Sequence, residues 1–203
     1  ETTLRSGILC RIARISFSGE MAFEIYVPSD YSNAMMDMLW KEAQVVGGCL
    51  YGLEALGALR IEKGHVTGAE LDGRITIDAA GLGRMASTKK SYIGSAMQKR
   101  GVLSNKDREK LVGIFPRNHK ETFDAGSILC KPTKIKGFGI GRITSVTHSP
   151  ALGHWIGLGL IMGGYEQWKG KTLVAADPVR NKNVEVEVVT PHMFDPEGER
   201  LHG

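Results

Sequence analysis

The 203-residue sequence lacks the features that define several large classes of protein. Its longest strongly apolar run, residues 155–162, is far too short to cross a bilayer as a helix, and no secretory signal is present. The chain has only three cysteines, Cys10, Cys49 and Cys130, and none lies in a C-x-x-C pair. A sparse, odd number of cysteines is typical of a reducing compartment. We therefore expect a cytoplasmic protein without membrane contact.

The sequence also lacks the short motifs of the commonest catalytic and cofactor sites. No G-x-G-x-x-G follows a strand and opens a helix, and no nucleophile elbow is present. The six histidines show no metal-ligand spacing with cysteines or carboxylates. The basic stretch of Lys131, Lys134 and Lys136 has no interleaved aromatic residues, and the net charge of +4 is mild. We interpret this stretch as solvated surface and expect neither a metal nor a nucleic-acid partner.

The first half of the chain predicts a mixture of strands and helices. Residues 7–16 and 23–27 are predicted strands on either side of a glycine-containing turn, which together make a hairpin. Apolar residues, several of them methionines, recur at helical spacing over 31–46, and we interpret this stripe as core packing. Further helices are predicted over 52–63 and 91–100.

The second half of the chain predicts strands alone. Short strands with glycine and proline turns between them favour a small barrel or sandwich, and we expect no helix there. The polar stretch 104–108 is the best boundary, so the predicted domains are 1–106 and 107–203 and the fold class is α+β. The expected strands are 110–115, 126–129, 139–147, 155–161, 171–175 and 184–189.

The predicted hairpin carries a recognisable pattern. Residues 14–25, R-I-S-F-S-G-E-M-A-F-E-I, resemble the G-Y-T-G-E-x-G-x-E-I signature of the aminomethyltransferase family. That family includes the glycine-cleavage T-protein, dimethylglycine dehydrogenase and the α subunit of heterotetrameric sarcosine oxidase. The resemblance implies that Glu24 stands where the family binds the pterin ring of tetrahydrofolate. A carboxylate there accepts two N–H donors at once. Phe17 replaces the family tyrosine and keeps a flat apolar ring beside the pterin.

The second predicted helix continues the resemblance. Residues 52–65 are similar to the family pattern G-L-x-A-x-x-x-L-R-x-E-x-G, and segments up to residue 94 match the stretch before the family's barrel. His65 follows the helix where relatives place an aromatic residue that faces the folate pocket. Leu56 stands where the T-protein branch carries a folate-contacting arginine, and the ending 195–203 resembles the sarcosine oxidase branch. The implied fold is a partial folate-binding domain followed by a small C-terminal β-barrel.

The resemblance also implies a function and partners. In the sarcosine oxidase branch, the imine product of sarcosine oxidation is converted to methylenetetrahydrofolate, so the expected enzyme is an oxidoreductase acting on CH–NH bonds with folate-dependent one-carbon transfer. Other sarcosine oxidase subunits are the expected partners, with FAD, FMN and NAD bound only in the intact complex, outside this chain. The family's catalytic aspartate lies upstream of the hairpin. Because the chain starts without Met inside a predicted strand, we expect a fragment that is inactive alone.

Plainer interpretations of the same residues stay open. Glu24 fits an exposed strand carboxylate, Phe17 fits core packing, and His65 fits a loop histidine with no special role. Arg60 and Glu62 are expected to form an ion pair that holds the helix end, in preference to contacting a ligand. At the level of function, the alternatives are the C-terminal region of a T-protein or of dimethylglycine dehydrogenase, or a non-catalytic module that binds folate or contacts other subunits.

Overall fold

The computed structural model describes residues 1–135 and 137–202 and divides the chain into two compact units. The N-terminal unit comprises Glu1–Leu59 and the C-terminal residues from Glu197 onward, and the barrel unit comprises Arg60–Pro196. Lys136 and Gly203, which belong to segments discussed above, lie outside the described residues. No helix within the described residues is long and apolar enough to span a membrane.

The N-terminal unit contains a small antiparallel sheet followed by a helix. The sheet has the order β1-β2-β3, and the β2–β3 hairpin is the one that the sequence predicts. Its elements are β1 (Thr2–Thr3), β2 (Leu9–Ala13), β3 (Glu24–Tyr26), the 3-10 turn η1 (Ser29–Tyr31), helix α1 (Ser32–Val45) and the C-terminal 3-10 turn η3 (Glu199–Leu201).

Helix α1 ends because of a glycine in the left-handed conformation. Gly47 has φ of 73°, and its amide donates to the carbonyl of Gln44. The amide of Gly48 bonds the carbonyl of Ala43 at 2.7 Å, so the last carbonyls of the helix are satisfied as in a Schellman ending. Of the residues in α1, only Met35 is buried, whereas Leu39 is 45% exposed. The apolar stripe of this helix therefore does not pack into a core of this chain, contrary to our interpretation.

The barrel unit begins inside the second helix. Helix α2 (Leu53–Lys63) passes from one unit to the other at Arg60. Loops that contain the short 3-10 turn η2 (Gly83–Met85) and helix α3 (Ser95–Gln98) then lead to the first strand of the barrel. Helix α3 covers only part of the predicted range 91–100.

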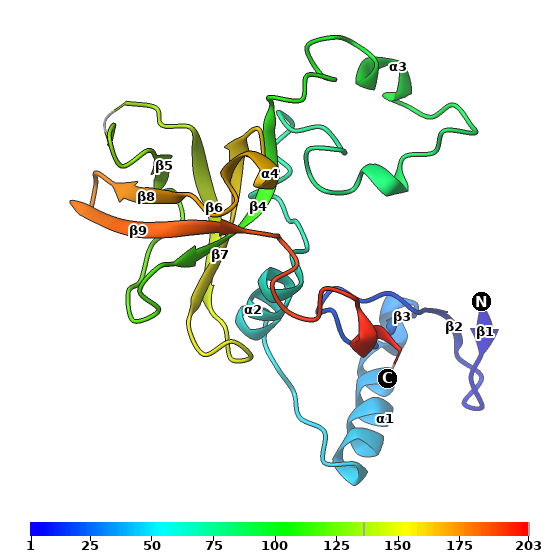
Figure 1. The fold of residues 1–203 in the computed structure, drawn as a ribbon. Coiled ribbons are helices and arrows are strands. Elements are labelled where there is room, and N and C mark those ends of the chain that lie inside the picture. The colour runs from blue at the N-terminus through cyan, green and yellow to red at the C-terminus, as the bar shows by residue number, and fades with distance from the viewer. Residues whose placement is uncertain (136, 203) are drawn as a thin grey trace. The chain divides into compact units, whose positions relative to one another are not determined.

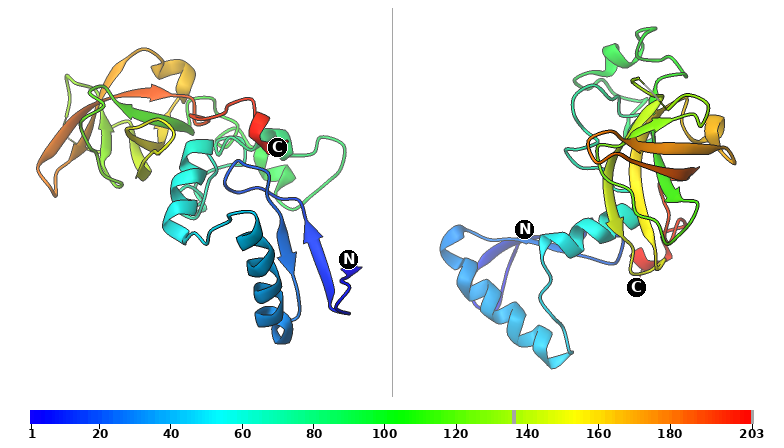
Figure 2. Two further views of the ribbon diagram at one scale, coloured as in Figure 1. Left: turned by 90° about the horizontal axis from the view of Figure 1, so that it is seen from below. Right: turned by 90° about the vertical axis from the view of Figure 1, so that its left-hand side faces the viewer.

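Six antiparallel strands close into a barrel in the order β4-β7-β6-β5-β8-β9, with β9 pairing back to β4 (Figures 1 and 2). Each predicted strand is present with its ends shifted by a few residues at most. The strands are β4 (Glu109–Pro116), β5 (Ile128–Cys130), β6 (Gly141–His148), β7 (Trp155–Met162), β8 (Thr172–Asp177) and β9 (Lys182–Val189).

The expectation of no helix in this half is wrong, because a short helix, α4 (Tyr165–Trp168), lies between β7 and β8. The indole of Trp168 is buried and donates a hydrogen bond to the carbonyl of Met162 at 2.7 Å. An aromatic anchor of this kind fixes a single helical turn that is too short to give a periodic signal.

The barrel encloses the main core of the chain. Its largest cluster includes Val112, Ile114, Leu129 and Val186, all with no exposed surface. Strand β7 is closely packed against its neighbours at Gly157. A Cβ at Gly157 would lie 2.8 Å from the ring of Phe123 and from the carbonyl oxygen of Ser145, so only glycine fits there.

Candidate functional site

The hairpin that carries Glu24 is shaped by hydroxyl groups and one glycine. The hydroxyl of Ser16 accepts a hydrogen bond from the amide of Gly19 at 3.0 Å, and that of Ser18 accepts from the amide of Glu20 at 3.4 Å. Gly19 has φ of 92°, a conformation that other residues rarely adopt. The register then places Glu24 opposite Ala13 at the start of β3.

Glu24 is exposed, and its carboxylate is held by a neighbour on its own strand. The Oε2 atom accepts a short hydrogen bond from the phenol of Tyr26. Residues two apart on a strand share a face, so Tyr26 was detectable from spacing alone, although we did not predict it. The hydrogen bond to Glu24 raises the pKa of Tyr26, and burial and the negative charge of Glu24 act in the same direction. No described residue donates to the second carboxylate oxygen, Oε1.

A small cavity of about 230 Å³ lies beside the turn of the same hairpin. The C-terminal residues form part of it: the guanidinium of Arg14 donates to the carbonyl of Leu201 at 2.7 Å, and Arg200 pairs with Glu20 at 2.9 Å. Glu24 and Phe17 are not among the residues that line this cavity. Phe17 is 37% exposed and lies in the turn region of the hairpin.

The third predicted residue, His65, belongs to the barrel unit, whereas Glu24 and Phe17 belong to the N-terminal unit. His65 is half-buried just after α2. Its amide donates to the carbonyl of Arg60 at 2.8 Å, and its carbonyl accepts from the guanidinium of Arg60 at 3.2 Å. These contacts close the end of the helix and fix the backbone of His65.

Arg60 and Glu62 do not pair with each other, and that expectation is wrong. Positions two apart on a helix face different sides. Arg60 pairs with Glu70 at 3.2 Å and also donates to Ser145 at 2.7 Å. Glu62 accepts a short hydrogen bond from the hydroxyl of Ser149. The charged residues of the second motif thus attach the end of α2 to the barrel strands and loops.

Glu70, which sequence reasoning missed, is the centre of this network and has no exposed surface. Its carboxylate accepts from the hydroxyls of Ser145 and Thr144 at 2.6 Å each and from the amide of Thr67 at 2.8 Å. Burial pushes the pKa of Glu70 upward, but these hydrogen bonds and the charge of Arg60 outweigh it and hold the pKa below the ordinary value of 4.5. The residues described in the structure contain no cluster of three metal-ligating side chains.

Two family models match the chain in succession. The GCVT N-terminal domain matches residues 1–90, and the glycine cleavage T-protein C-terminal barrel domain matches residues 110–195. The chain belongs to the glycine cleavage T-protein family. The closed six-strand barrel described above corresponds to the second of these domains. The predicted boundary between 106 and 107 is not tested by these matches and stays a prediction.

Proteins similar to this chain include sarcosine oxidase alpha subunits and aminomethyltransferases. The chain is 38% identical to a sarcosine oxidase subunit alpha of Rhizobium meliloti, with 93% of this chain and 19% of that protein covered. It is 35% identical to the corresponding subunit of Corynebacterium sp. strain U-96, with 100% and 21% covered. An aminomethyltransferase of Desulfitobacterium hafniense is 34% identical, with 93% and 49% covered. The chain thus spans about a fifth of the first two relatives and about half of the third.

A solved structure supports the fold. The aminomethyltransferase T of the Bartonella henselae glycine cleavage system matches with a TM-score of 0.75 at 22% identity, over 91% of this chain and 50% of that one. The predicted fold, a partial T-protein-like domain followed by a C-terminal barrel, is therefore confirmed. The predicted resemblance to the sarcosine oxidase α subunit is also confirmed.

Proposed function

We propose that this chain is the tetrahydrofolate-binding part of a sarcosine oxidase α subunit, with Glu24 as the ligand of the pterin ring. The observation that carries the proposal is the position of Glu24, which faces solvent on β3 with one carboxylate oxygen held by Tyr26 and the other without a described donor. A carboxylate held in this way accepts a pair of N–H donors from a flat heterocycle through charge-assisted hydrogen bonds. Phe17, in the preceding turn, supplies an apolar ring surface.

The proposed reaction is the one that the resemblance to sarcosine oxidase α subunits implies. In the intact enzyme, a flavin would accept two electrons from sarcosine. The resulting imine would pass its methylene carbon to tetrahydrofolate, which gives methylenetetrahydrofolate and releases glycine. The other sarcosine oxidase subunits, with FAD, FMN and NAD, would complete the enzyme outside this chain. The aminomethyltransferase relatives support the folate step, and the identities of 35–38% to sarcosine oxidase subunits favour that branch. Leu56, in place of the arginine of the T-protein branch, favours the same assignment.

The place of His65 in the folate site and the cytoplasmic location stay parts of this proposal. His65 has a fixed backbone at the end of α2, which suits a residue that positions a ring. The three cysteines, Cys10, Cys49 and Cys130, are all free thiols, which is consistent with a reducing compartment.

The test replaces Glu24 by Gln in the intact enzyme. Losing a charge-assisted pair removes about 1.5–3 kcal/mol, so the dissociation constant for tetrahydrofolate should rise roughly tenfold or more. Sarcosine oxidation at the flavin should continue at its usual rate, while the products shift from methylenetetrahydrofolate toward free formaldehyde at limiting folate. Calorimetry measures the affinity, and product analysis measures the ratio.

The matched control is Glu20→Gln on the same hairpin. Glu20 forms an exposed pair with Arg200, and such pairs contribute little, so folate affinity should stay within about twofold. Equal losses in the two variants would point to damage of the hairpin, and an unchanged product ratio in the Glu24 variant would overturn the assignment. The isolated chain, with only part of the pocket, should bind tetrahydrofolate weakly, with a dissociation constant of roughly millimolar order.

A further inference from the structure

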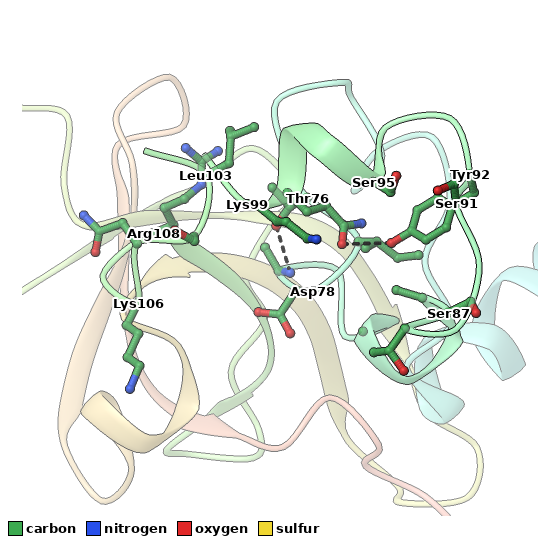
Figure 3. Close-up of a pocket in the computed structure, with 18 of the residues that line it drawn as sticks. Thr76, Asp78, Ser87, Ser91, Tyr92, Ser95, Lys99, Leu103, Lys106 and Arg108 are labelled. Carbon is green, nitrogen blue, oxygen red and sulfur yellow. Dashed lines mark hydrogen bonds between the residues drawn. The ribbon is translucent and has the colours of Figure 1, made fainter. Parts of the chain in front are cut away.

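A cavity outside the proposed folate site lies in the barrel unit, in the loops that precede β4. It has a volume of about 790 Å³ and is formed by parts of the segment 76–110, including the start of η2, helix α3 and the start of β4 (Figure 3). This volume is within the range of small-molecule sites, about 300–1,000 Å³. None of the residues of the proposed folate site lines it.

The lining of this cavity is strongly positive. It contains six of the 26 basic residues of the chain but only one of the 22 acidic residues, Asp78. The remaining basic and acidic residues are almost equal in number, so the cavity alone accounts for the net positive charge of +4. The basic residues are Lys89, Lys90, Lys99, Lys106, Arg108 and Lys110.

These charges are not neutralised by the described protein. Ion pairs are common nearby, since Arg142 pairs with both Asp72 and Glu109, yet no described carboxylate pairs with any of the six cavity cations. Arg108 is held instead by two backbone carbonyls, those of Arg74 at 2.8 Å and Val102 at 3.4 Å. Its Nε atom is buried without a hydrogen-bond partner. A buried donor without a partner is costly, and an anion would satisfy it.

Hydroxyl groups supply further donors around the same space. Tyr92 already donates to the side chain of Gln98 at 3.0 Å, which ties α3 to the loop before it (Figure 3). The lining also includes six serine and threonine residues, which are Thr76, Ser87, Thr88, Ser91, Ser95 and Ser104. A site with so many N–H and O–H donors suits a ligand with several charged acceptor oxygens.

We propose that this cavity binds a phosphate group, either free phosphate or the phosphomonoester of a small molecule. A phosphate carries a charge of about −1.5 to −2 near neutral pH and three strong acceptor oxygens, whereas a carboxylate carries one charge on two oxygens. Six cations without a described ion pair, together with the hydroxyl groups of the lining, match a phosphate and exceed what a single carboxylate can use. The proposal concerns residues 76–110 only and does not depend on folate binding.

The first experiment measures binding of inorganic phosphate, phenyl phosphate and phthalate to the full protein by calorimetry. Phthalate is a dicarboxylate of similar charge and serves as the control for charge alone. We expect saturable binding of both phosphates that weakens as salt is added, with phthalate markedly weaker. Tighter binding of phenyl phosphate would assign the site to a phosphomonoester, and equal binding would assign it to free phosphate. Absence of phosphate binding, or equal binding of phthalate, would overturn the proposal.

The second experiment uses variants that are expected to change the affinity for phosphate in opposite directions. Lys89 and Lys99 are exposed and have no described ion pair, so the double variant Lys89→Gln/Lys99→Gln should fold and bind phosphate roughly tenfold more weakly. Asp78→Asn removes the only acidic group of the lining and should tighten binding about threefold or more. An increase in affinity cannot result from unfolding, so this variant keeps the test decisive.

The matched control is Lys120→Gln/Lys134→Gln, which changes the charge of the same unit equally at exposed positions away from the cavity. It should bind phosphate within about twofold of the unmodified protein if the cavity itself is the site. An equal loss in this control, or no gain in Asp78→Asn, would show that the attraction is a general effect of charge and would overturn the proposal.

Discussion

The two units of this chain differ in how they use their apolar residues. In the barrel unit, side chains such as Ile114 and Leu158 have no exposed surface. In the N-terminal unit, Leu9, Phe23 and Leu39 are 55%, 55% and 45% exposed. A closed barrel has no free edge and buries its inner face within itself, whereas a short sheet and one helix leave apolar faces in contact with water. Within this chain, the barrel unit therefore holds most of the folding free energy that comes from burial.

The largest expected effect is the loss of stability that follows when the buried network attaching α2 to the barrel is disrupted. Glu70→Gln leaves the guanidinium of Arg60, which is almost fully buried, without its counter-charge. Breaking a buried pair on one side costs about 3–5 kcal/mol. Urea unfolding followed by tryptophan fluorescence measures the loss, in a Trp40→Phe background so that the signal comes from Trp155 and Trp168 of the barrel unit.

The dependence of stability on pH provides the control for this prediction. Because the folded pKa of Glu70 lies below 4.5, its contribution to stability is complete above that pH and is lost as the pH falls through the lower folded value. The barrel unit should therefore lose stability as the pH drops below about 4.5, and the Glu70→Gln variant should show a shallower dependence on pH. The same slope in both proteins would mean that the pKa of Glu70 does not change on folding.

A smaller loss of stability is expected when one leucine side chain is truncated in each unit, and the two losses can be compared directly. Leu158→Ala empties part of a core in which the side chain has no exposed surface, and such changes cost about 2–5 kcal/mol. Leu39→Ala removes a side chain that is 45% exposed on α1 and should cost less than about 1 kcal/mol. Thermal and urea unfolding of the two variants measures the difference. Similar losses would show that the apolar face of α1 is covered in solution, and the contrast between the units would not hold.

The sequence was sufficient to predict the strands of the barrel. In each strand, apolar residues either alternate with polar ones or follow one another, and turns with glycine or proline separate the strands. The order β4-β7-β6-β5-β8-β9 depends on contacts between residues distant in sequence, and periodicity carries no information on these. The same limit applies to Glu70. Nothing local distinguishes it from a surface glutamate, because its partners Thr144 and Ser145 lie more than seventy residues away. The family pattern singled out Glu24 as a candidate, and its role stays a prediction. Its neighbour Tyr26 could have been found from the two-residue repeat of a strand alone.

The smallest expected effect concerns the hairpin and gives an independent measure of where Glu24 points. The hydrogen bond to Glu24 raises the pKa of Tyr26 above its ordinary value of 10.0. Glu24→Gln removes the negative charge that stabilises the protonated phenol, so Tyr26 should lose its proton at a lower pH in the variant. Titration of the tyrosine absorbance in the ultraviolet measures this, and Tyr26→Phe identifies which of the five tyrosines is responsible. Both residues are exposed, so neither change should disturb folding of the barrel unit. If the titration of Tyr26 is the same with Glu24 and with Gln at that position, the carboxylate does not rest on the phenol in solution. The pre-positioned acceptor on which the folate proposal relies would then be absent.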